Sequence, residues 1–175
     1  MWRHTVDVMT RAWLTKASFV WAPGEGHYGN GDTLDEATAY PGDNYVDWVA
    51  SDGYNHNSSD GWCGAMGRPH TGWCTFEEVF HDSIVPGGNV EQDFRGRKPY
   101  MIAETGSTEG TAGQKEQWLT DADSRIKAAF PGLYAFVYFD IDTRSTEGCC
   151  NWRLDSTTNV LDGFNVMADD AFFMR

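Results

Sequence analysis

Four short, unbroken apolar runs are the feature that most limits how this 175-residue chain can fold. We expect each run to form a β-strand, and the runs occupy residues 17–22, 48–51, 100–103 and 135–139. A strand that is apolar at every position is covered on both faces, which is typical of the parallel sheets of α/β proteins. This leaves two architectures: a small doubly wound sheet, or part of a (β/α)8 barrel, which needs about 250 residues when complete.

Amphipathic and capped segments between these runs predict the helices. Apolar residues recur at helical spacing in residues 2–15 and 118–130. The segment from Thr75 to Glu78 matches a capping box, in which the two side chains bond reciprocally to the backbone, so we expect a helix over 75–84. After the fourth run we expect a loop and then a C-terminal tail.

Polar and aromatic side chains lie where the apolar runs end. These residues are Trp21, Asp52, Tyr54, Asn55, Glu104 and Asp140. In a (β/α)8 barrel the active site is built at the carboxyl ends of the strands. Glu104 is the strongest candidate, because a carboxylate at the end of a buried strand loses hydration, which proteins seldom accept without a role for the charge. Tyr54, at the end of a neighbouring run, is the nearest candidate hydrogen-bond donor.

Charge and composition exclude several classes of function. The net charge of −13 argues against a nucleic-acid or anionic-membrane partner. No run of about 18 apolar residues is present, so we expect no membrane span. The segment Gly24-Glu25-Gly26 lacks the third glycine of a dinucleotide fingerprint, so we expect no nucleotide cofactor. Aromatic residues make up 14% of the chain, and several of the 8 Trp adjoin Gly or Asn, which together with the acidity favours a carbohydrate ligand.

The four cysteines leave the disulfide connectivity open. Cys63 and Cys74 lie eleven positions apart in a segment that a disulfide could close. Cys149 and Cys150 are adjacent, and neighbours bridge only with backbone strain, so each could instead pair with a distant cysteine. Disulfides would favour an oxidising compartment.

We expect no metal site. A zinc site built from Cys63, His70 and Cys74 lacks a fourth ligand. The oxygen-rich segment 30–36 does not have the spacing of a calcium-binding EF-hand, and an exposed acidic loop accounts for it.

Several segments resemble one enzyme family in order and spacing. They are residues 19–23, 40–48, 52–55, 98–106 and 151–153. Together they resemble the C-terminal half of glycoside hydrolase family 26, the endo-mannanase-like retaining enzymes, over nearly the whole chain. The resemblance implies that residues 1–175 are the C-terminal half of a (β/α)8 catalytic domain, with the four runs as strands five to eight. It implies hydrolysis of β-1,4-mannan or a related β-glycan outside the cell, although the N-terminal residues do not form a signal peptide.

The resemblance also assigns roles to individual residues. It implies that Glu104 is the catalytic nucleophile, that Tyr54 orients it, and that Trp152 lines the sugar subsite next to the scissile bond. Trp21, Asn55 and Asp52 would contact the substrate. A retaining glycosidase needs a second carboxyl group that acts as acid and base. In the family this is a glutamate after strand four, before the point where this chain begins, so we expect little or no activity from this chain alone.

Two other readings remain open from the sequence. In the first, the chain is a non-catalytic carbohydrate-binding module whose Trp-rich loops bind the glycan. In the second, it is a structural fragment that needs another chain, because a half barrel exposes two strand edges and an apolar sheet face, which favours self-association. The sequence does not decide which glycan is bound or which oligomer forms.

Overall fold

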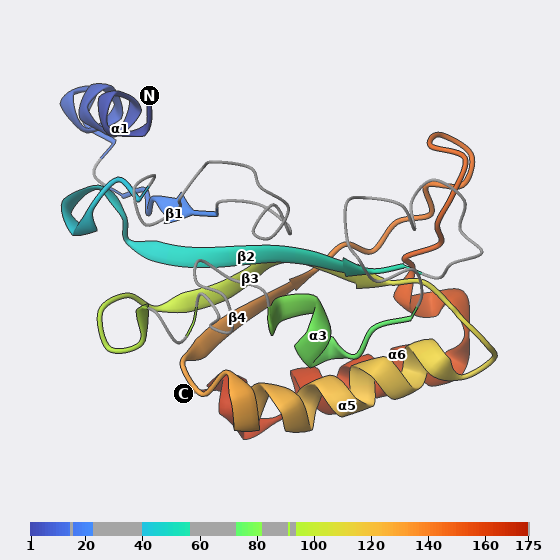
Figure 1. Cartoon of the computed structure of the whole chain (residues 1–175). Helices are drawn as coiled ribbons and strands as arrows, with labels where there is room; N and C mark the ends of the chain where they lie inside the picture. The colour runs from blue at the N-terminus through green and yellow to red at the C-terminus, as the bar shows by residue number, and fades with distance from the viewer. Residues whose placement is uncertain (15, 23–39, 57–72, 82–90, 92–93, 175) are drawn as a thin grey trace.

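The computed structural model of this chain describes residues 1–14, 16–22, 40–56, 73–81, 91 and 94–174. Its centre is a four-stranded parallel sheet in the order β1-β2-β3-β4 (Figure 1). The strands are β1 (Val20–Trp21), β2 (Trp48–Asn55), β3 (Tyr100–Ser107) and β4 (Leu133–Tyr138). The expected α/β class with a parallel four-stranded sheet is therefore confirmed.

Helices α3 (Phe76–His81), α5 (Gln114–Ala129) and α6 (Thr158–Ala168) cover one face of this sheet (Figure 1). Helix α1 (Trp2–Arg11) lies apart from them, beside the amino-terminal end of β2. Short 3-10 turns occur at η1 (Asp43–Tyr45), η3 (Leu154–Ser156) and η4 (Ala171–Met174). The main hydrophobic core lies between the sheet and these three helices, and its centre is fully buried. Its central residues are Val49, Phe76, Ile102, Trp118, Leu119, Ile126, Phe130 and Leu133.

Local sequence signals form the helix ends as expected. The backbone N–H of Thr75 donates to Glu78 Oε2 at 2.8 Å, and the N–H of Glu78 donates to Thr75 Oγ1 at 3.3 Å, which confirms the capping box. Beyond the end of α5, the N–H of Gly132 donates to the buried carboxylate of Glu91 at 2.8 Å. Arg95 pairs with the same carboxylate through two nitrogens, so Glu91 ties the α5–β4 turn to the segment before β3.

Four of the described elements differ clearly from the sequence expectation. Strands β2 and β3 continue through polar residues, because their backbones stay paired as far as Asn55 and Ser107. Strand β1 is only two residues long. The C-terminal tail contains helix α6, whose first turn is capped by Thr157 and whose residues Val160, Gly163 and Met167 are buried.

Candidate active site

Glu104 faces away from the helices because β3 is irregular at Ala103. Ser51 pairs with Ile102, but the next residue of β2, Asp52, pairs with Glu104, so Ala103 is an extra residue in β3. Residues two apart on a regular strand share a face, which would place Glu104 beside Ile102 in the core. The bulge reverses this alternation, and Glu104 is exposed while Ile102 is fully buried. The sequence expectation that Glu104 ends its strand was wrong, because β3 runs on to Ser107.

Tyr54 and Asp52 share this face of the sheet with Glu104. Between them Gly53 faces the helices, since a Cβ there would lie 2.8 Å from Val79 of α3. The hydroxyl of Tyr54 donates a short hydrogen bond to Glu104 Oε1. Burial, and then the negative charge of Glu104, raise the pKa of the half-buried Asp52. The structure thus brings two carboxyl groups and a phenol together on neighbouring strands.

An aromatic cluster adjoins this group. The ring of Trp152 lies 4.9 Å from that of Tyr54 and 5.0 Å from that of His56, and Phe139 packs edge-on against Tyr54 at 6.0 Å. Gly106 makes room for the rings, because a Cβ there would lie 2.9 Å from Trp152 Cε3 and 3.3 Å from Tyr54 Cδ1. The cluster therefore depends on a glycine two residues after Glu104.

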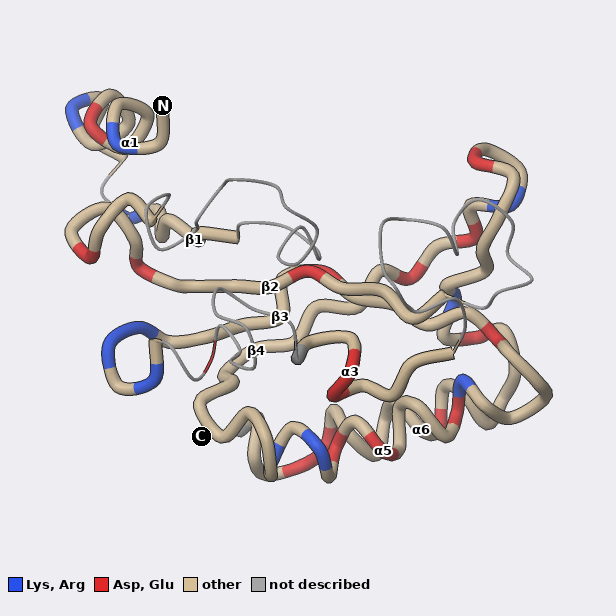
Figure 2. The backbone as a smooth tube through the Cα atoms, viewed as in Figure 1, with Lys and Arg blue, Asp and Glu red and all other residues tan. Residues whose placement is uncertain are grey.

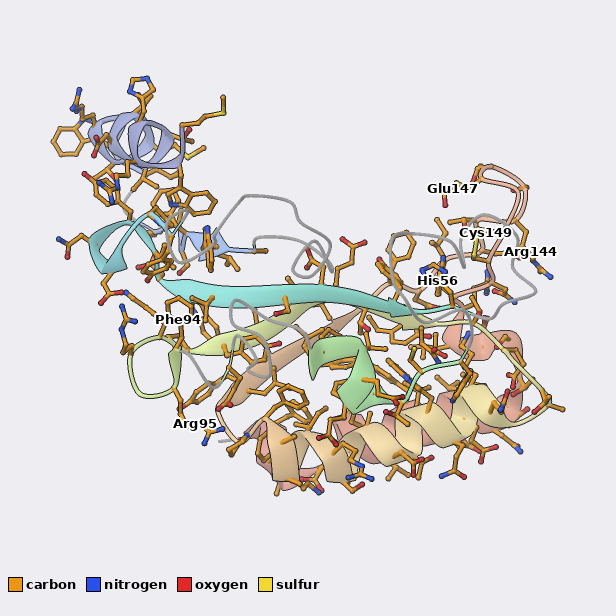
Figure 3. The ribbon with its side chains drawn as sticks, in the orientation of Figure 1. His56, Phe94, Arg95, Arg144, Glu147 and Cys149 are labelled. Atoms are coloured by element: carbon orange, nitrogen blue, oxygen red, sulfur yellow. A yellow bond between two sulfur atoms is a disulfide. The ribbon has the colours of Figure 1, made fainter. Side chains whose placement is uncertain are left out.

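Cys149 and Cys150 form a disulfide with each other, which answers for this pair the connectivity that the sequence left open. Both cysteines are buried against Trp152, with Tyr54 and Phe139 packed around them. Cys150 has a φ of 80°, the left-handed region that glycine favours. The hydroxyl and the N–H of Thr143 bond to the backbone oxygens of this pair, so the bridge belongs to a folded loop. Figure 3 places Cys149 near His56, at the end of β2. The Cys63–Cys74 proposal lies partly outside the described residues.

The other predicted substrate contacts lie deeper. Trp152 is only 4% exposed and Trp21 6%, and Trp21 packs in the core against Tyr40 and Phe94. The side chain of Asn55 is fully buried: it donates to Ser107 Oγ at 3.1 Å and accepts from the N–H of Cys74 at 2.9 Å. The structure therefore brings Asp52, Tyr54 and Trp152 together around Glu104. The contacts of Trp21 and Asn55 are those of scaffold residues.

Three basic side chains lie far from this group, and the two arginines near it, Arg144 and Arg153, pair with Asp142 and Asp155. Arg95, Arg97 and Lys98 come just before β3, at the opposite end of the sheet from the aromatic cluster (Figure 2). Two of them have partners at that end: Arg97 forms an ion pair with Asp43, and the ammonium of Lys98 donates to the carbonyl oxygen of Val46. The site itself is acidic and aromatic, which suits a neutral polar ligand better than an anion.

In the described ranges, no three His, Cys, Asp or Glu side chains are arranged to hold a metal ion. Segment 30–36, Cys63 and His70, which the sequence analysis weighed as metal ligands, lie outside those ranges. Among the described helices, none combines the length and the apolar content that a membrane span requires.

The chain is similar in sequence to part of a much larger protein. No family model matches the chain. Over 162 residues, or 93% of its length, the chain is 30% identical to Endoglucanase H of Acetivibrio thermocellus, and it spans 16% of that protein. The fold also resembles the crystal structure of an engineered protein, with a TM-score of 0.57 and 20% identity over 98% of this chain and 34% of the other. The chain is therefore an α/β protein with an acidic, aromatic candidate site. In sequence it is similar to a segment of Endoglucanase H.

Proposed function

We propose that this chain is part of the catalytic domain of a retaining β-glycan hydrolase, with Glu104 as its nucleophile. The observation that carries the proposal is the hydrogen bond from the Tyr54 hydroxyl to Glu104, on a sheet face that also holds Asp52 and the Trp152 cluster. The similarity to Endoglucanase H supports a glycan as substrate. The two substrates to compare are β-1,4-mannan, which the family resemblance implies, and a related β-glycan such as glucan.

The proposed reaction is a double displacement. The Glu104 carboxylate attacks the anomeric carbon, the glycosidic bond breaks, and a second carboxyl group gives its proton to the departing oxygen. Water, deprotonated by that second group, then cleaves the glycosyl ester and releases Glu104. Tyr54 holds the attacking oxygen in place through its hydrogen bond. We propose that this chain supplies the nucleophile but not the acid and base.

The arrangement of the sheet supports a barrel for the complete domain. We propose that β1 to β4 are the fifth to eighth strands of a (β/α)8 barrel. The four strands are parallel and lie in the order of the sequence, and α3, α5 and α6 cover one face (Figure 1). A doubly wound sheet instead carries helices on both faces. We also propose an extracellular location, which the Cys149–Cys150 disulfide supports because disulfides persist in oxidising compartments.

An assay of the 175-residue chain tests this function. The substrates are mannan, a mixed-linkage glucan, and aryl β-mannosides and β-glucosides whose phenol leaves without protonation. We expect little or no polysaccharide hydrolysis and a slow release of phenol that Glu104→Ala abolishes. The control Glu77→Ala breaks only an exposed ion pair with Arg125 and leaves this release unchanged.

Three outcomes would contradict parts of the proposal. Rapid polysaccharide hydrolysis that depends on Glu104 would show that the chain contains its own acid and base. Release of phenol that persists in Glu104→Ala would remove Glu104 from the mechanism. Oligosaccharide binding without any Glu104-dependent chemistry would instead favour a carbohydrate-binding module.

A further inference from the structure

Lys115 is a fully buried lysine in the first turn of α5, where two effects oppose its charge. The dipole of a helix favours negative charge at this end. Burial also disfavours the ammonium and lowers the pKa of Lys115 to about 8, although the carboxylates of Glu109, Asp140 and Asp155 act in the opposite direction. A charge in such a place is expected only where it makes strong contacts.

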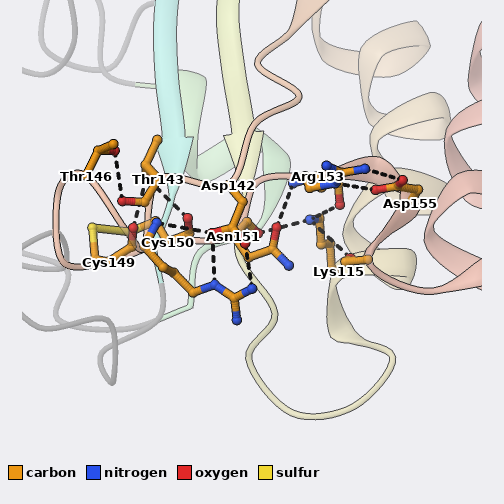
Figure 4. A network of polar contacts seen from close by, with 11 residues as sticks. Lys115, Asp142, Thr143, Thr146, Cys149, Cys150, Asn151, Arg153 and Asp155 are labelled. Carbon is orange, nitrogen blue, oxygen red and sulfur yellow. Dashed lines mark hydrogen bonds and ion pairs between the residues drawn. A yellow bond between two sulfur atoms is a disulfide. The ribbon is translucent and has the colours of Figure 1, made fainter.

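Those contacts are made with the backbone on both sides of Trp152. Lys115 Nζ donates to the carbonyl oxygen of Arg153 at 2.7 Å and to that of Asn151 at 3.2 Å (Figure 4). A longer contact of 3.5 Å reaches Ser156 Oγ. The ammonium therefore links the helix layer to the carbonyl groups of the residues before and after Trp152. Hydrogen bonds from an ionised donor are about twice as strong as neutral ones.

The sheet side holds the same segment by other bonds. The N–H of Trp152 donates to the carbonyl oxygen of Ile141 at 3.0 Å, and the N–H of Leu154 donates to Asp140 Oδ1 at 2.7 Å. Both acceptors lie just after β4. Lys115 adds the attachment to α5, so the segment is fixed from two layers of the fold.

We propose that Lys115 is a positioning residue for glycan binding, whose ammonium holds Trp152 against Tyr54 beside Glu104. This inference rests on the proposed function. Lys115 touches neither Glu104 nor the reacting atoms. It acts through the backbone of residues 151–153, and losing it releases Trp152 from its packing on Tyr54, where the two rings now lie 4.9 Å apart.

The test compares three variants of the 175-residue chain. Lys115→Met keeps the length of the side chain and removes its donors, and Lys115→Gln keeps an uncharged amide donor. The matched control is Lys127→Met on the same helix, which removes a lysine that pairs with Asp123 and Asp170 at the surface. Amide hydrogen exchange of residues 150–156 and the indole N–H signal of Trp152, assigned with Trp152→Phe, report on the free protein. Calorimetric titration with cellohexaose and mannohexaose reports on binding.

We expect Lys115→Met to raise exchange rates in residues 150–156 and the dissociation constant of the bound hexaose, each by about tenfold. For Lys115→Gln we expect exchange rates and a dissociation constant between those of Lys115→Met and those of the wild type. Lys127→Met changes both quantities by less than about twofold, because exposed ion pairs contribute little.

Two results would overturn the inference. Unchanged exchange around Trp152 in Lys115→Met would show that Lys115 does not hold it. Faster exchange with an unchanged dissociation constant would reduce Lys115 to a structural residue. Should Lys115→Met not fold, Lys115→Gln decides by the same two criteria. Failure of the wild type to bind either hexaose would contradict the proposed function. In that case the exchange rates of Lys115→Met still test whether Lys115 holds Trp152: faster exchange supports this role, and unchanged exchange overturns it.

Discussion

In the candidate site, two carboxyl groups lie beside each other on neighbouring strands. Asp52 and Glu104 are direct partners in the parallel register, so their side chains leave the sheet on the same face. Glu104 is exposed and accepts the Tyr54 hydrogen bond, whereas Asp52 is half buried. Burial and the neighbouring charge both raise the pKa of Asp52, so this residue holds its proton to a higher pH than an ordinary aspartate.

The raised pKa of Asp52 predicts the sign of a stability change. Above the ordinary aspartate pKa of 3.8 the folded state binds more protons than the unfolded state, so this group makes the free energy of unfolding fall as pH rises through its raised pKa. Asp52→Asn should remove that fall and stabilise the protein at neutral pH, while it weakens oligosaccharide binding. Denaturant unfolding of wild type and variant between about pH 3 and pH 7 measures the difference.

Asp155→Asn is the control for this measurement. The Arg153 hydrogen bond lowers the pKa of Asp155, so its contribution has the opposite sign and is lost as pH falls. A free energy of unfolding of the wild type that does not fall relative to that of Asp52→Asn as pH rises would contradict the assignment.

At the scale of elements, β3 joins the core to the site. Its bulge at Ala103 turns Glu104 out of the core, and its Gly106 leaves space for the rings of Tyr54 and Trp152. The chain after β4 then supplies Trp152 from a loop held by the Cys149–Cys150 disulfide, Thr143 and Lys115 (Figure 4). The site is therefore assembled by neighbouring strands and one loop that packs over them.

Gly106→Ala tests how the strand supports the ring cluster. The added methyl group would lie 2.9 Å from Trp152 Cε3, so the ring must move. We expect a loss of about 1–3 kcal/mol in the free energy of unfolding and weaker oligosaccharide binding. Gly53→Ala is the matched control, because its methyl group would meet Val79 and Phe80 on the helix face. It should destabilise the protein similarly without changing the affinity of the folded fraction, and equal losses of affinity in both variants would contradict the proposed division of faces.

At the scale of the whole molecule, several large apolar side chains are exposed. On and just after β4, which ends the sheet in the described order, Tyr134 is 50%, Val137 46% and Ile141 47% exposed. On α1 and the turn after it, the exposed residues are Val8, Met9, Trp13 and Leu14. Exposed apolar surface favours contact with another protein, and an edge strand can pair with another chain.

This surface predicts self-association of the isolated chain. We expect sedimentation velocity to show dimers or larger species whose share increases with protein concentration. Val137→Lys, which places a charge on β4, should shift the distribution toward the monomer while circular dichroism stays unchanged. A stable monomer of the wild type at concentrations of about 100 μM would contradict the prediction.

Much of the fold follows from local sequence patterns. The apolar runs locate all four strands, and Thr75 with Glu78 places the start of α3, because these signals depend only on neighbours in the chain. Helix α6 was missed although Thr157 is a good N-cap, because its buried residues Val160, Gly163 and Met167 include a glycine that weakens the apolar pattern. The burial of Lys115 could also be predicted from the sequence, because its position lies on the apolar stripe of α5 with Trp118, Ala122 and Ile126.

Local sequence patterns were enough to predict the α/β class and the order of the four strands, and to single out Glu104 and Tyr54 as candidates, since apolar periodicity and residue chemistry are local properties. Three features became visible only in the folded chain: Ala103 forms a bulge that turns Glu104 out of the core, Cys149 bridges Cys150, and Lys115 reaches the backbone beside Trp152. The physical reason is that strand register and the burial of a charge are set by partners far away in the chain, such as Asp52 for Glu104.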